Sequence, residues 1–459
     1  MDKYKVIIGM EVHVELKTVS KMFCGCKNDP FNALEPNIYT CPVCLGFPGA
    51  LPVANKKAIE WTIKLGLALG CKINMFSKFD RKHYFYPDLA KGYQISQYDL
   101  PFCYDGKVDT SLGPVGIRRI HLEEDTGKLI HDTVDGKKVS LIDFNRSGVP
   151  LVEIVTEPSI FSSAQAKEYA KKLRQVIRYL DISDADMEKG GMRLEANISL
   201  KKFKVQSSKL KINEGSENST DELPGYKVEL KNINSFRYLE RGIEYEIKRQ
   251  MEILEDGRTP VQETRGYNAE KNITYSQRTK EDAADYRYFP DPDLPPIRMD
   301  DDFLTTVKSS SPIGLEELFT AWKERYGLKR EVVELLFETS TEANWLEKLF
   351  SLAKKEGVKV DDLVNRLVNK KLKAVLFEGE AKKIVDEYKK QTTVDDVTDG
   401  ELKSIVMKVL KANQKAVTDY RAGKTNVVNF LVGMVMREAK KKIEFGRVVK
   451  MITSTIINT

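Results

Sequence analysis

Four cysteines near the start of the chain form two close pairs, an arrangement that is typical of metal binding. One residue separates Cys24 from Cys26, two residues separate Cys41 from Cys44, and fourteen residues lie between the pairs. Tetrahedral Zn²⁺ is held well by four thiolates, and a loop of this length lets two close pairs complete that geometry. Because four thiolates leave no open position, we predict a structural zinc site. Two disulfides or free thiols are the alternative.

Acidic residues and a histidine form a second group that could carry chemistry. Glu11 and His13 alternate with apolar residues, which places both on one face of a strand, about 7 Å apart. Other strand-like segments contribute the carboxylates of Glu123, Glu124, Glu153 and Glu195. If the segments converge, these side chains form a Mg²⁺ or Mn²⁺ site that neutralises nucleotide phosphates. Solvated strand faces with ordinary ion pairs are the alternative, because spacing along the chain leaves convergence undecided.

Two basic segments are suited to contact with nucleotide or RNA. Residues 79–88 interleave Arg, Lys and His with aromatic rings around Lys82, and such mixtures bind phosphates and stack on bases. Packing of an aromatic edge strand is the alternative. Residues 401–459 hold 12 Lys or Arg and 4 Asp or Glu, so we predict that this tail binds a polyanion such as RNA. The predicted contacts are Arg437, Lys440, Lys441 and Lys442, for which favourable placement at a helix C-terminus is the alternative.

Two common catalytic motifs are missing from the sequence. No G-x-x-x-x-G-K-[ST] segment exists, so the use of ATP cannot depend on a P-loop. No G-x-S-x-G segment exists either, so the chain has no visible nucleophile for acyl transfer.

The elements that must position these residues change character along the chain. Up to about residue 290, period-2 alternation predicts an antiparallel sheet with one buried and one polar face, interrupted by helices over 55–69 and 163–180. Residues 201–225 are typical of a long hairpin, and the proline-rich 289–296 segment is typical of a domain boundary. Later segments have helical periodicity. We therefore predict an α+β fold with domains at 1–295, 296–395 and 396–459.

Composition narrows the class of protein. The chain has 459 residues, of which 41% are hydrophobic and 31% charged, and a formal net charge of +6. These values are typical of a folded globular protein and exclude disorder as the main state. No apolar run reaches the roughly 18 residues of a membrane span, and the N-terminus has no leader-like segment. We therefore expect a cytoplasmic protein that does not act at a membrane.

Eight segments, spread in order over the first 296 residues, closely resemble one known family. They include 93–98 (YQISQY), 143–150 (DFNRSGVP) and 285–290 (DYRYFP), together with 8–16, 79–88, 122–128, 192–200 and 229–236. The family is that of the B subunits of the aspartyl/glutamyl-tRNA(Asn/Gln) amidotransferases. The helical remainder is similar to the helical domain and the small YqeY-like tail domain of that family. The resemblance implies that the first domain is a large cradle built on the antiparallel sheet.

The resemblance also implies an activity, cofactors and partners. Members of the family use ATP and Mg²⁺ to phosphorylate the side-chain carboxylate of Glu on tRNA(Gln) or Asp on tRNA(Asn), and ammonia then displaces phosphate. They are ATP-dependent carbon–nitrogen ligases in which glutamine is the amido donor. An amidase (glutaminase) of the A type supplies the ammonia, and a small C-type protein completes the heterotrimer. This division of labour accounts for the absence of a nucleophile and of a P-loop.

The resemblance carries over to individual residues. It implies that Glu11, His13, Glu123 and Glu124 handle metal and phosphate, joined by Glu153 and Glu195. Lys82 resembles a residue at the exit of the ammonia channel. The resulting catalytic set is Glu11, His13, Glu124 and Lys82. A zinc-containing scaffold that binds tRNA without catalysis is the alternative function.

Overall fold

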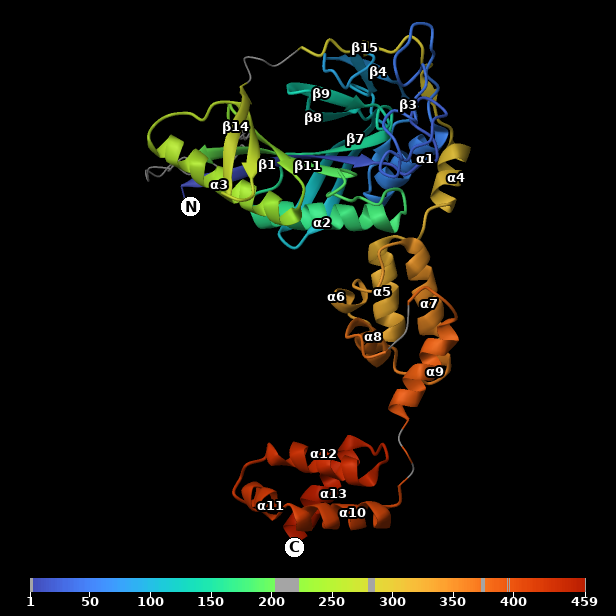
Figure 1. Ribbon diagram of the computed structural model, residues 1–459, viewed down its shortest axis with the longest axis vertical. Coiled ribbons are helices and arrows are strands. Elements are labelled where there is room, and N and C mark those ends of the chain that lie inside the picture. Colours follow the sequence, from blue (N-terminus) through green and yellow to red (C-terminus); the bar gives the residue numbers. More distant parts are fainter. Residues whose placement is uncertain are drawn as a thin grey trace, which may run out of the picture. The chain divides into compact units, whose positions relative to one another are not determined.

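The computed structural model describes residues 3–202, 223–279, 285–372, 376–393, 395 and 397–458. The hairpin predicted over 201–225 therefore lies mostly outside the described residues. The chain divides into two compact units, one made of Met1–Ala321 with Phe337–Ser340 and the other of Trp322–Leu336 with Thr341–Thr459 (Figure 1). The boundaries expected at residues 295/296 and 395/396 stay predictions.

A nine-stranded sheet forms the centre of the first unit, in the order β14-β13-β12-β11-β1-β10-β7-β6-β2. Its strands are β1 (Tyr4–Glu15), β2 (Lys72–Ile73), β6 (Cys103–Thr110), β7 (Gly113–Glu124), β10 (Pro150–Thr156), β11 (Met192–Lys202), β12 (Val228–Ile233), β13 (Glu263–Asn268) and β14 (Ile273–Thr279). All neighbours are antiparallel except β12 and β13, which run parallel because helix α3 (Phe236–Glu255) crosses between them. The predicted α+β character with a large, mainly antiparallel sheet is confirmed.

The two faces of this sheet differ as the alternation in β1 predicts. Met10, Val12 and Val14 are buried in the core, on the face that α3 and α2 (Ser163–Tyr179) line (Figure 1). Glu11 and His13 occupy the intervening positions and point to the other face. The sheet therefore has an apolar side that packs against helices and a polar side that carries the candidate chemistry.

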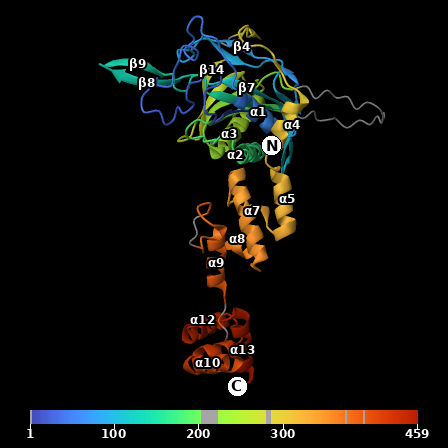
Figure 2. The ribbon, with the colours of Figure 1, turned by 90° about the vertical axis from the view of Figure 1, so that its right-hand side faces the viewer.

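Smaller sheets complete the first unit. Strands β4 (Asp80–His83), β5 (Tyr93–Ser96) and β15 (Phe289–Pro290) form one, β3 (Phe76–Ser77) and β16 (Ile297–Arg298) a second, and β8 (Lys128–Val134) with β9 (Lys137–Asp143) a third. The β8–β9 hairpin projects from the unit (Figure 2). The proline-rich 289–296 segment packs back onto β4, because Arg81 binds the carboxylates of Asp291 and Asp293 at 2.8 Å and 2.7 Å.

The predicted helices of the first unit have clear caps. Helix α1 (Lys56–Ala68) follows Asn55, whose side chain accepts from the amides of residues 57 and 58. Helix α2 follows Ser162, whose hydroxyl accepts from the amide of Gln165 at 3.1 Å. Helix α4 (Asp301–Ser309), for which the sequence pattern made no prediction, is capped by Asp300. The caps at Asn55 and Ser162 explain why α1 and α2 begin where the sequence pattern predicts.

Helices alone build the second unit within its described residues. They are α5 (Leu315–Tyr326) and α7 (Ser340–Lys355), which contribute residues to both units, and then α6 (Arg330–Val333), α8 (Val360–Val368), α9 (Ala381–Thr392), α10 (Asp399–Ala412), α11 (Gln414–Arg421), α12 (Val427–Ala439) and α13 (Phe445–Asn458). Val406, Leu431, Val435 and Ile452 lie in a common core of α10, α12 and α13.

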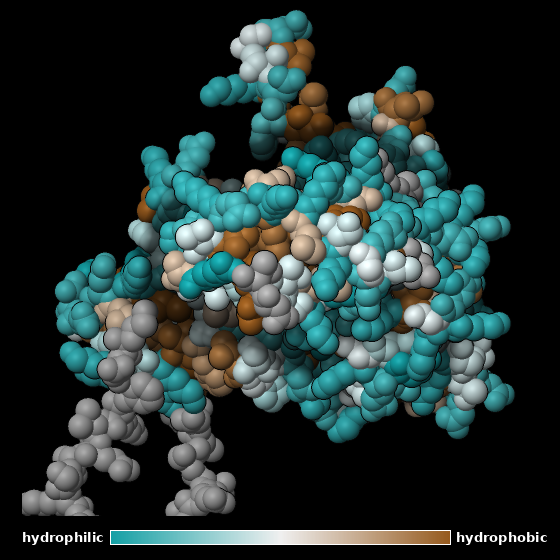
Figure 3. All heavy atoms as spheres, turned by 90° about the horizontal axis from the view of Figure 1, so that it is seen from below, coloured by the Kyte–Doolittle hydropathy of each residue, from teal (hydrophilic) through white to brown (hydrophobic). Residues whose placement is uncertain are grey.

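Among the described residues no helix is long and apolar enough to cross a membrane. Hydrophilic residues cover most of the face in Figure 3.

Candidate functional site

Three neighbouring strands bring two histidines and two carboxylates together on the polar face. His13 of β1 is paired with Glu153 of β10, and Glu153 is paired with His121 of β7. The Nε2 atoms of His13 and His121 lie 3.4 Å and 3.2 Å from Glu153 Oε2. Glu123 brings a carboxylate oxygen to 3.8 Å from His13 Nε2. The ligand atoms of His13, Glu123 and Glu153, called here the histidine group, lie within 4.8 Å of one another, so one cation can contact all three.

Burial and charge shift the pKa values within the histidine group. Burial alone lowers the pKa of His13, but the carboxylates of Glu153, Glu195 and Glu123 raise it to about 9. Burial alone raises the pKa of Glu153, yet His121 and His13 hold it well below its ordinary value. The carboxylates thus favour the protonated form of the His13 imidazole, and a metal ion that binds the group would replace this proton.

A second group of three carboxylates lies beside the first. Glu11 of β1, Glu195 of β11 and Glu229 of β12, called here the carboxylate group, place one oxygen each within 4.8 Å of the others. Burial raises the pKa of Glu11, and the charges of Glu153, Glu195 and Glu229 raise it further. Lys231 offsets part of this charge, with Nζ 3.0 Å from Glu195 Oε2. The clustered negative charge favours a divalent cation.

The donor atoms of the carboxylate group fit Mg²⁺ or Mn²⁺. Asn197 donates a hydrogen bond from Nδ2 to Glu11 Oε1 at 2.9 Å. Its Oδ1 atom is buried and has no partner among the residues that the structure describes. A buried amide oxygen without a donor is costly, and a hard cation with its water would satisfy it. Asn197, which is paired with Glu229 across the strands, can therefore offer a further oxygen beside the three carboxylates.

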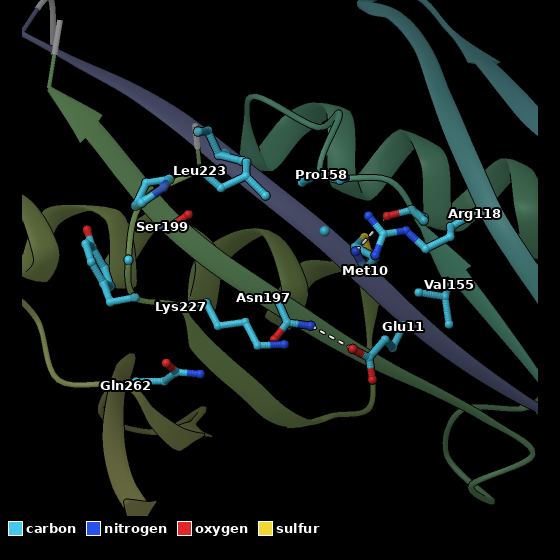
Figure 4. A pocket seen from close by; sticks show the side chains of 16 residues that line it. Met10, Glu11, Arg118, Val155, Pro158, Asn197, Ser199, Leu223, Lys227 and Gln262 are labelled. Atoms are coloured by element: carbon cyan, nitrogen blue, oxygen red, sulfur yellow. Dashed lines mark hydrogen bonds between the residues drawn. The ribbon is translucent and has the colours of Figure 1, made fainter. Parts of the chain in front are cut away.

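A pocket opens next to the carboxylate group. Its volume is about 350 Å³, and its lining combines Glu11 and Asn197 with backbone and side chains of β1, β7, β10 and the 223–227 segment. In Figure 4 the hydrogen bond between Asn197 and Glu11 lies in the middle of this wall, with Arg118 on one side and Lys227 on the other. The pocket joins negative groups that can hold a metal to positive groups that can meet phosphate.

Lys82 stands among aromatic rings and close to the histidine group. Its Nζ atom lies 5.1 Å from the ring centre of Tyr286 and 6.0 Å from that of Tyr84. Burial alone lowers the pKa of Lys82, but the carboxylates of Glu123 and Glu153 raise it above its ordinary value. The lysine is therefore held as a cation facing the acidic side chains.

Glu124 does not belong to either cation-binding group of the described residues. It follows Glu123 on β7, and alternation points it to the opposite side of the strand. Its carboxylate pairs with the Lys91 ammonium and accepts a hydrogen bond from the Ile95 amide at 3.0 Å. This glutamate therefore ties the end of β7 to β5.

The four cysteines converge as their spacing predicts. The sulfur atoms of Cys24, Cys26, Cys41 and Cys44 lie within 4.8 Å of one another, and all four are free thiols. Tetrahedral Zn²⁺ with bonds of about 2.3 Å needs sulfur atoms about 3.8 Å apart, and Cys41 and Cys44 are 3.9 Å apart. A hydrogen bond from Cys24 and the charge of Lys21 lower the pKa of Cys44 to about 5. The residues fit a structural zinc ion.

The predicted RNA-binding residues lie together at the end of α12. Arg437 and Lys440, Lys441 and Lys442 are all exposed. Lys441 pairs with Glu401 at 2.8 Å, and Lys442 Nζ donates to the carbonyl of Lys390 at 2.7 Å. The three lysines and Lys390 line a shallow pocket, so the tail presents concentrated positive charge there.

Among the titratable residues of the site, sequence reasoning missed His121 and Glu229. His121 was visible as a histidine next to Glu123, but only the pairing of β7 with β10 sets it against Glu153. Glu229 lies in an alternating segment, and the pairing of Asn197 with Glu229 brings it to the carboxylate group. A cross-strand alignment would have found both, because partners in a sheet follow from register.

Comparisons with known proteins identify the family of the chain. The GatB/GatE catalytic domain matches residues 6–305, and the GatB domain matches residues 336–456. Three similar proteins are all B subunits of aspartyl/glutamyl-tRNA(Asn/Gln) amidotransferases. The one from a Thermoanaerobacter species is 41% identical over 96% of both chains, and that of Thermomicrobium roseum is 42% identical over 95% of both. The protein of Symbiobacterium thermophilum is 40% identical over 99% of this chain and 98% of its own. The chain therefore belongs to the family of aspartyl/glutamyl-tRNA(Asn/Gln) amidotransferase B subunits.

Proposed function

We propose that this chain converts Glu on tRNA(Gln), or Asp on tRNA(Asn), to the corresponding amide in two steps, phosphorylation of the side-chain carboxylate by ATP and then amidation of the acyl phosphate by ammonia. The observation that carries the proposal is the position of two cation-binding groups on one sheet face, with Glu11 of the carboxylate group in the lining of a pocket large enough to admit part of a nucleotide. The names of the relatives supply the substrate class. The polar face would be the floor of the cradle domain, where ATP and the aminoacyl end of the tRNA meet.

ATP would bind with its phosphates toward the two groups. The histidine group offers His13, Glu123 and Glu153, and the carboxylate group offers Glu11 and Glu195 with the newly found Glu229. Bound Mg²⁺ or Mn²⁺ supplies charge neutralisation at the transferring phosphoryl group. Glu124 enters as a positioning residue through its contacts with Lys91 and β5.

The chemistry follows from the poor reactivity of a carboxylate toward ammonia. A side-chain oxygen of the aminoacyl group attacks the γ-phosphorus of ATP, and ADP leaves. Ammonia then attacks the carbonyl carbon of the acyl phosphate, phosphate leaves, and one proton must be removed from nitrogen. The carboxylates would hold the metal ion that orients the phosphates, and a site from which water is excluded would protect the acyl phosphate from hydrolysis.

Lys82 would act where ammonia reaches this site. Its ammonium, packed against Tyr286 and facing Glu123, repels the protonated ammonium ion and admits neutral ammonia. The gating role is supported by the charge pairing between the lysine and the histidine group. Burial alone raises the pKa of Glu123, but His121 and Lys82 hold it below its ordinary value, so this carboxylate pairs with the lysine and is a weak base toward ammonium.

The remaining parts of the proposal concern support and partners. The four cysteines hold a structural Zn²⁺, and the residues around Arg437 bind the phosphate backbone of tRNA. A glutaminase of the A type supplies ammonia and a small C-type protein completes the complex, since the name of the relatives describes one component of a larger assembly. No acyl-transfer nucleophile motif is present in the sequence, which supports hydrolysis of glutamine by another chain.

The test is amidation by the reconstituted heterotrimer. Both misacylated tRNAs, ATP, Mg²⁺ and ammonium chloride are supplied, and formation of amide and of ADP is measured. We expect amide formation with at least one tRNA and its loss by at least about 100-fold in Glu153→Gln. Glu168→Gln on the exposed face of α2 is the matched control.

Two outcomes would contradict the proposal. Unchanged amidation in Glu153→Gln would remove the histidine group from the reaction. ATP hydrolysis that never depends on aminoacyl-tRNA would favour the alternative, a scaffold that binds zinc and tRNA without catalysis. Glutaminase activity of the complex should remain in both variants, which separates loss of chemistry from loss of assembly.

A further inference from the structure

Lys21 is a fully buried lysine at the edge of the four-cysteine cluster. Its side chain is 0% exposed, which is rare for lysine unless its charge is compensated. The Nζ atom donates to the carbonyls of Tyr39 at 2.6 Å and Phe144 at 3.2 Å, and its third contact is Cys44 Sγ at 3.9 Å. Within the described part of the chain it forms no ion pair with a carboxylate.

The sulfur atoms are therefore the negative charge that Lys21 can compensate. Four thiolates around one Zn²⁺ carry a net charge of −2, and burying this charge is costly without nearby cations or donors. Two carbonyls satisfy the hydrogen bonds of the ammonium but not its charge. A cation and an anion that are each costly alone stabilise one another when they are buried together.

The same contacts join the cluster to a loop that is distant in sequence. Lys21 binds Phe144, Asn145 accepts from the Tyr39 amide at 2.8 Å, and the Ser147 hydroxyl donates to the Cys44 carbonyl at 3.0 Å. Gly148 has φ +84°, and a Cβ there would lie 3.5 Å from Cys44 Cβ. The 144–148 loop is thus fitted closely against the cysteines.

The loop and the cluster in turn reach the end of β7. The Gly148 amide donates to the Asp125 carbonyl at 2.9 Å. On the other side, a Cβ on Gly46 would lie 3.0 Å from Lys91 Cα, and Lys91 pairs with Glu124. The segments that pack around the cysteine cluster therefore contact the backbone of Asp125, through Gly148, and the Lys91 partner of Glu124, through Gly46.

We propose that Lys21 is a positioning residue of the four-cysteine site, where its ammonium offsets the charge of the metal–thiolate cluster and joins that cluster to the 144–148 loop. The inference rests on the proposed binding of zinc. In this proposal Lys21 helps to retain the metal, and it also connects the metal site to the active-site end of β7.

The first experiment measures zinc loss from the full-length chain to the chromophoric chelator pyridylazoresorcinol. Lys21→Met keeps the length of the side chain and removes the charge, and we expect zinc to transfer at least about tenfold faster than from the parent. Lys27→Met is the matched control, because Lys27 is close to the cysteines in sequence but its side chain is 56% exposed and pairs with Asp29. Lys21→Arg, which restores the charge, should lose zinc more slowly than Lys21→Met.

A second experiment uses the unaltered protein and does not depend on the folding of a variant. Lysines are acetylated with an N-hydroxysuccinimide ester, with and without prior removal of zinc, and modification is followed by mass spectrometry. We expect Lys21 to be protected in the zinc form and modified about tenfold faster once zinc is removed, while the rate at exposed Lys27 changes little.

The outcomes separate the inference from the function on which it rests. If the parent binds no zinc, both the zinc proposal and the role of Lys21 fall. If the parent holds zinc but Lys21→Met releases it at the parental rate, or Lys21→Arg and Lys21→Met release it equally fast, zinc binding stands and the charge role is wrong. Equal rates of Lys21 acetylation with and without zinc would also contradict the proposed contact between Lys21 and the metal site.

Discussion

Glu153 is the residue on which the two histidines of the polar face converge. His13 and His121 approach the same carboxylate oxygen from opposite neighbouring strands. A buried carboxylate with one cationic partner is ordinary, but one between two imidazoles and within metal-binding distance of Glu123 is typical of a functional site. The structure therefore predicts that protons and a metal ion compete for His13.

Metal binding to the histidine group should depend on pH. The pKa of His13 is raised to about 9 in the metal-free protein, and an imidazole must lose its proton to bind a metal ion. Affinity for Mn²⁺ should therefore rise with pH, by up to about tenfold per unit below that pKa, and level off above it. Calorimetric titration in buffers of different ionisation enthalpy will count the protons released.

A histidine far from the site provides the control for this pH dependence. His131 lies on the β8–β9 hairpin and is exposed, so His131→Gln should leave the profile unchanged. His13→Gln should make it shallower. A slope that is the same in His13→Gln as in the parent would show that other groups release the protons.

Lys82 should affect the use of ammonia more than the use of ATP. Lys82→Met removes the cation that faces Glu123, and loss of a group that controls protonation typically costs about 100-fold or more. We expect amidation to fall by that order while tRNA-dependent formation of ADP persists. Lys72→Met, an exposed lysine paired with Asp105, is the control. Equal loss of both reactions would place Lys82 in the phosphorylation step instead.

Strand pairing is the element-scale feature that creates the site. Strand β1 pairs with β11 on one side and β10 on the other, so its odd-numbered residues supply ligands to both groups. A shift of one residue in either register would turn those ligands into the apolar core. The buried side chains of Met10, Val12 and Val14 prevent such a shift.

The packing of α1 on this sheet can be tested at Gly66. A Cβ at Gly66 would collide with the side chain of Cys103 on β6. Alanine is favoured over glycine in a helix by about 1 kcal/mol, but overpacking of a buried contact costs about 1–3 kcal/mol. Gly66→Ala should therefore lower the thermal stability measured by calorimetry.

A second glycine gives the opposite expectation. Gly433 lies within α12 and has no atom within 4 Å of a Cβ built there, so Gly433→Ala should stabilise the protein by up to about 1 kcal/mol.

A second substitution tests the contact at Gly66. Replacing Cys103 with alanine should restore part of the stability that Gly66→Ala loses. Equal effects of alanine at both glycines would contradict the close contact between α1 and β6.

At the scale of the whole molecule, charge is divided between the units. The first unit carries the clustered carboxylates, whereas residues 401–459 carry a net charge of +8 from 12 basic and 4 acidic residues. A basic surface attracts nucleic acid through its phosphates irrespective of sequence, while the chemistry needs a separate negative site for metal. The division fits the proposed binding of tRNA by the basic tail and of an ATP–metal complex by the first unit.

The basic residues at the end of α12 should control tRNA affinity and its salt dependence. Arg437→Ala with Lys440→Ala removes two exposed charges, and each lost phosphate contact should make the slope of log K against log salt shallower by about 0.7–0.9. Amidation at saturating tRNA should change little. Filter binding across a salt series checks the slope, with Lys107→Ala on β6 as control. An unchanged slope would exclude these residues from the tRNA interface.

Local spacing was enough to determine several features of this protein. Alternation in 8–16 predicts the two-sided strand β1, Asn55 and Ser162 mark where α1 and α2 begin, and the spacing of the cysteines predicts a cluster that the structure forms. Each of these features depends on residues that are close together in the chain, and over such short distances backbone geometry limits where the side chains can lie. The segments shared with the family identified the family itself.

Only the tertiary structure decided which carboxylates act together. Glu123 and Glu124 are equivalent in the sequence, but one joins His13 and the other pairs with Lys91, because adjacent residues in a strand point to opposite sides. The inclusion of His121 and Glu229 follows from strand registers that pair His121 with Glu153 and Asn197 with Glu229, residues that lie 32 positions apart in each case. Nothing in the sequence indicated the role proposed for Lys21, for the same reason. Its partner Phe144 lies 123 residues away, and both burial and long-range contacts arise only when the chain folds.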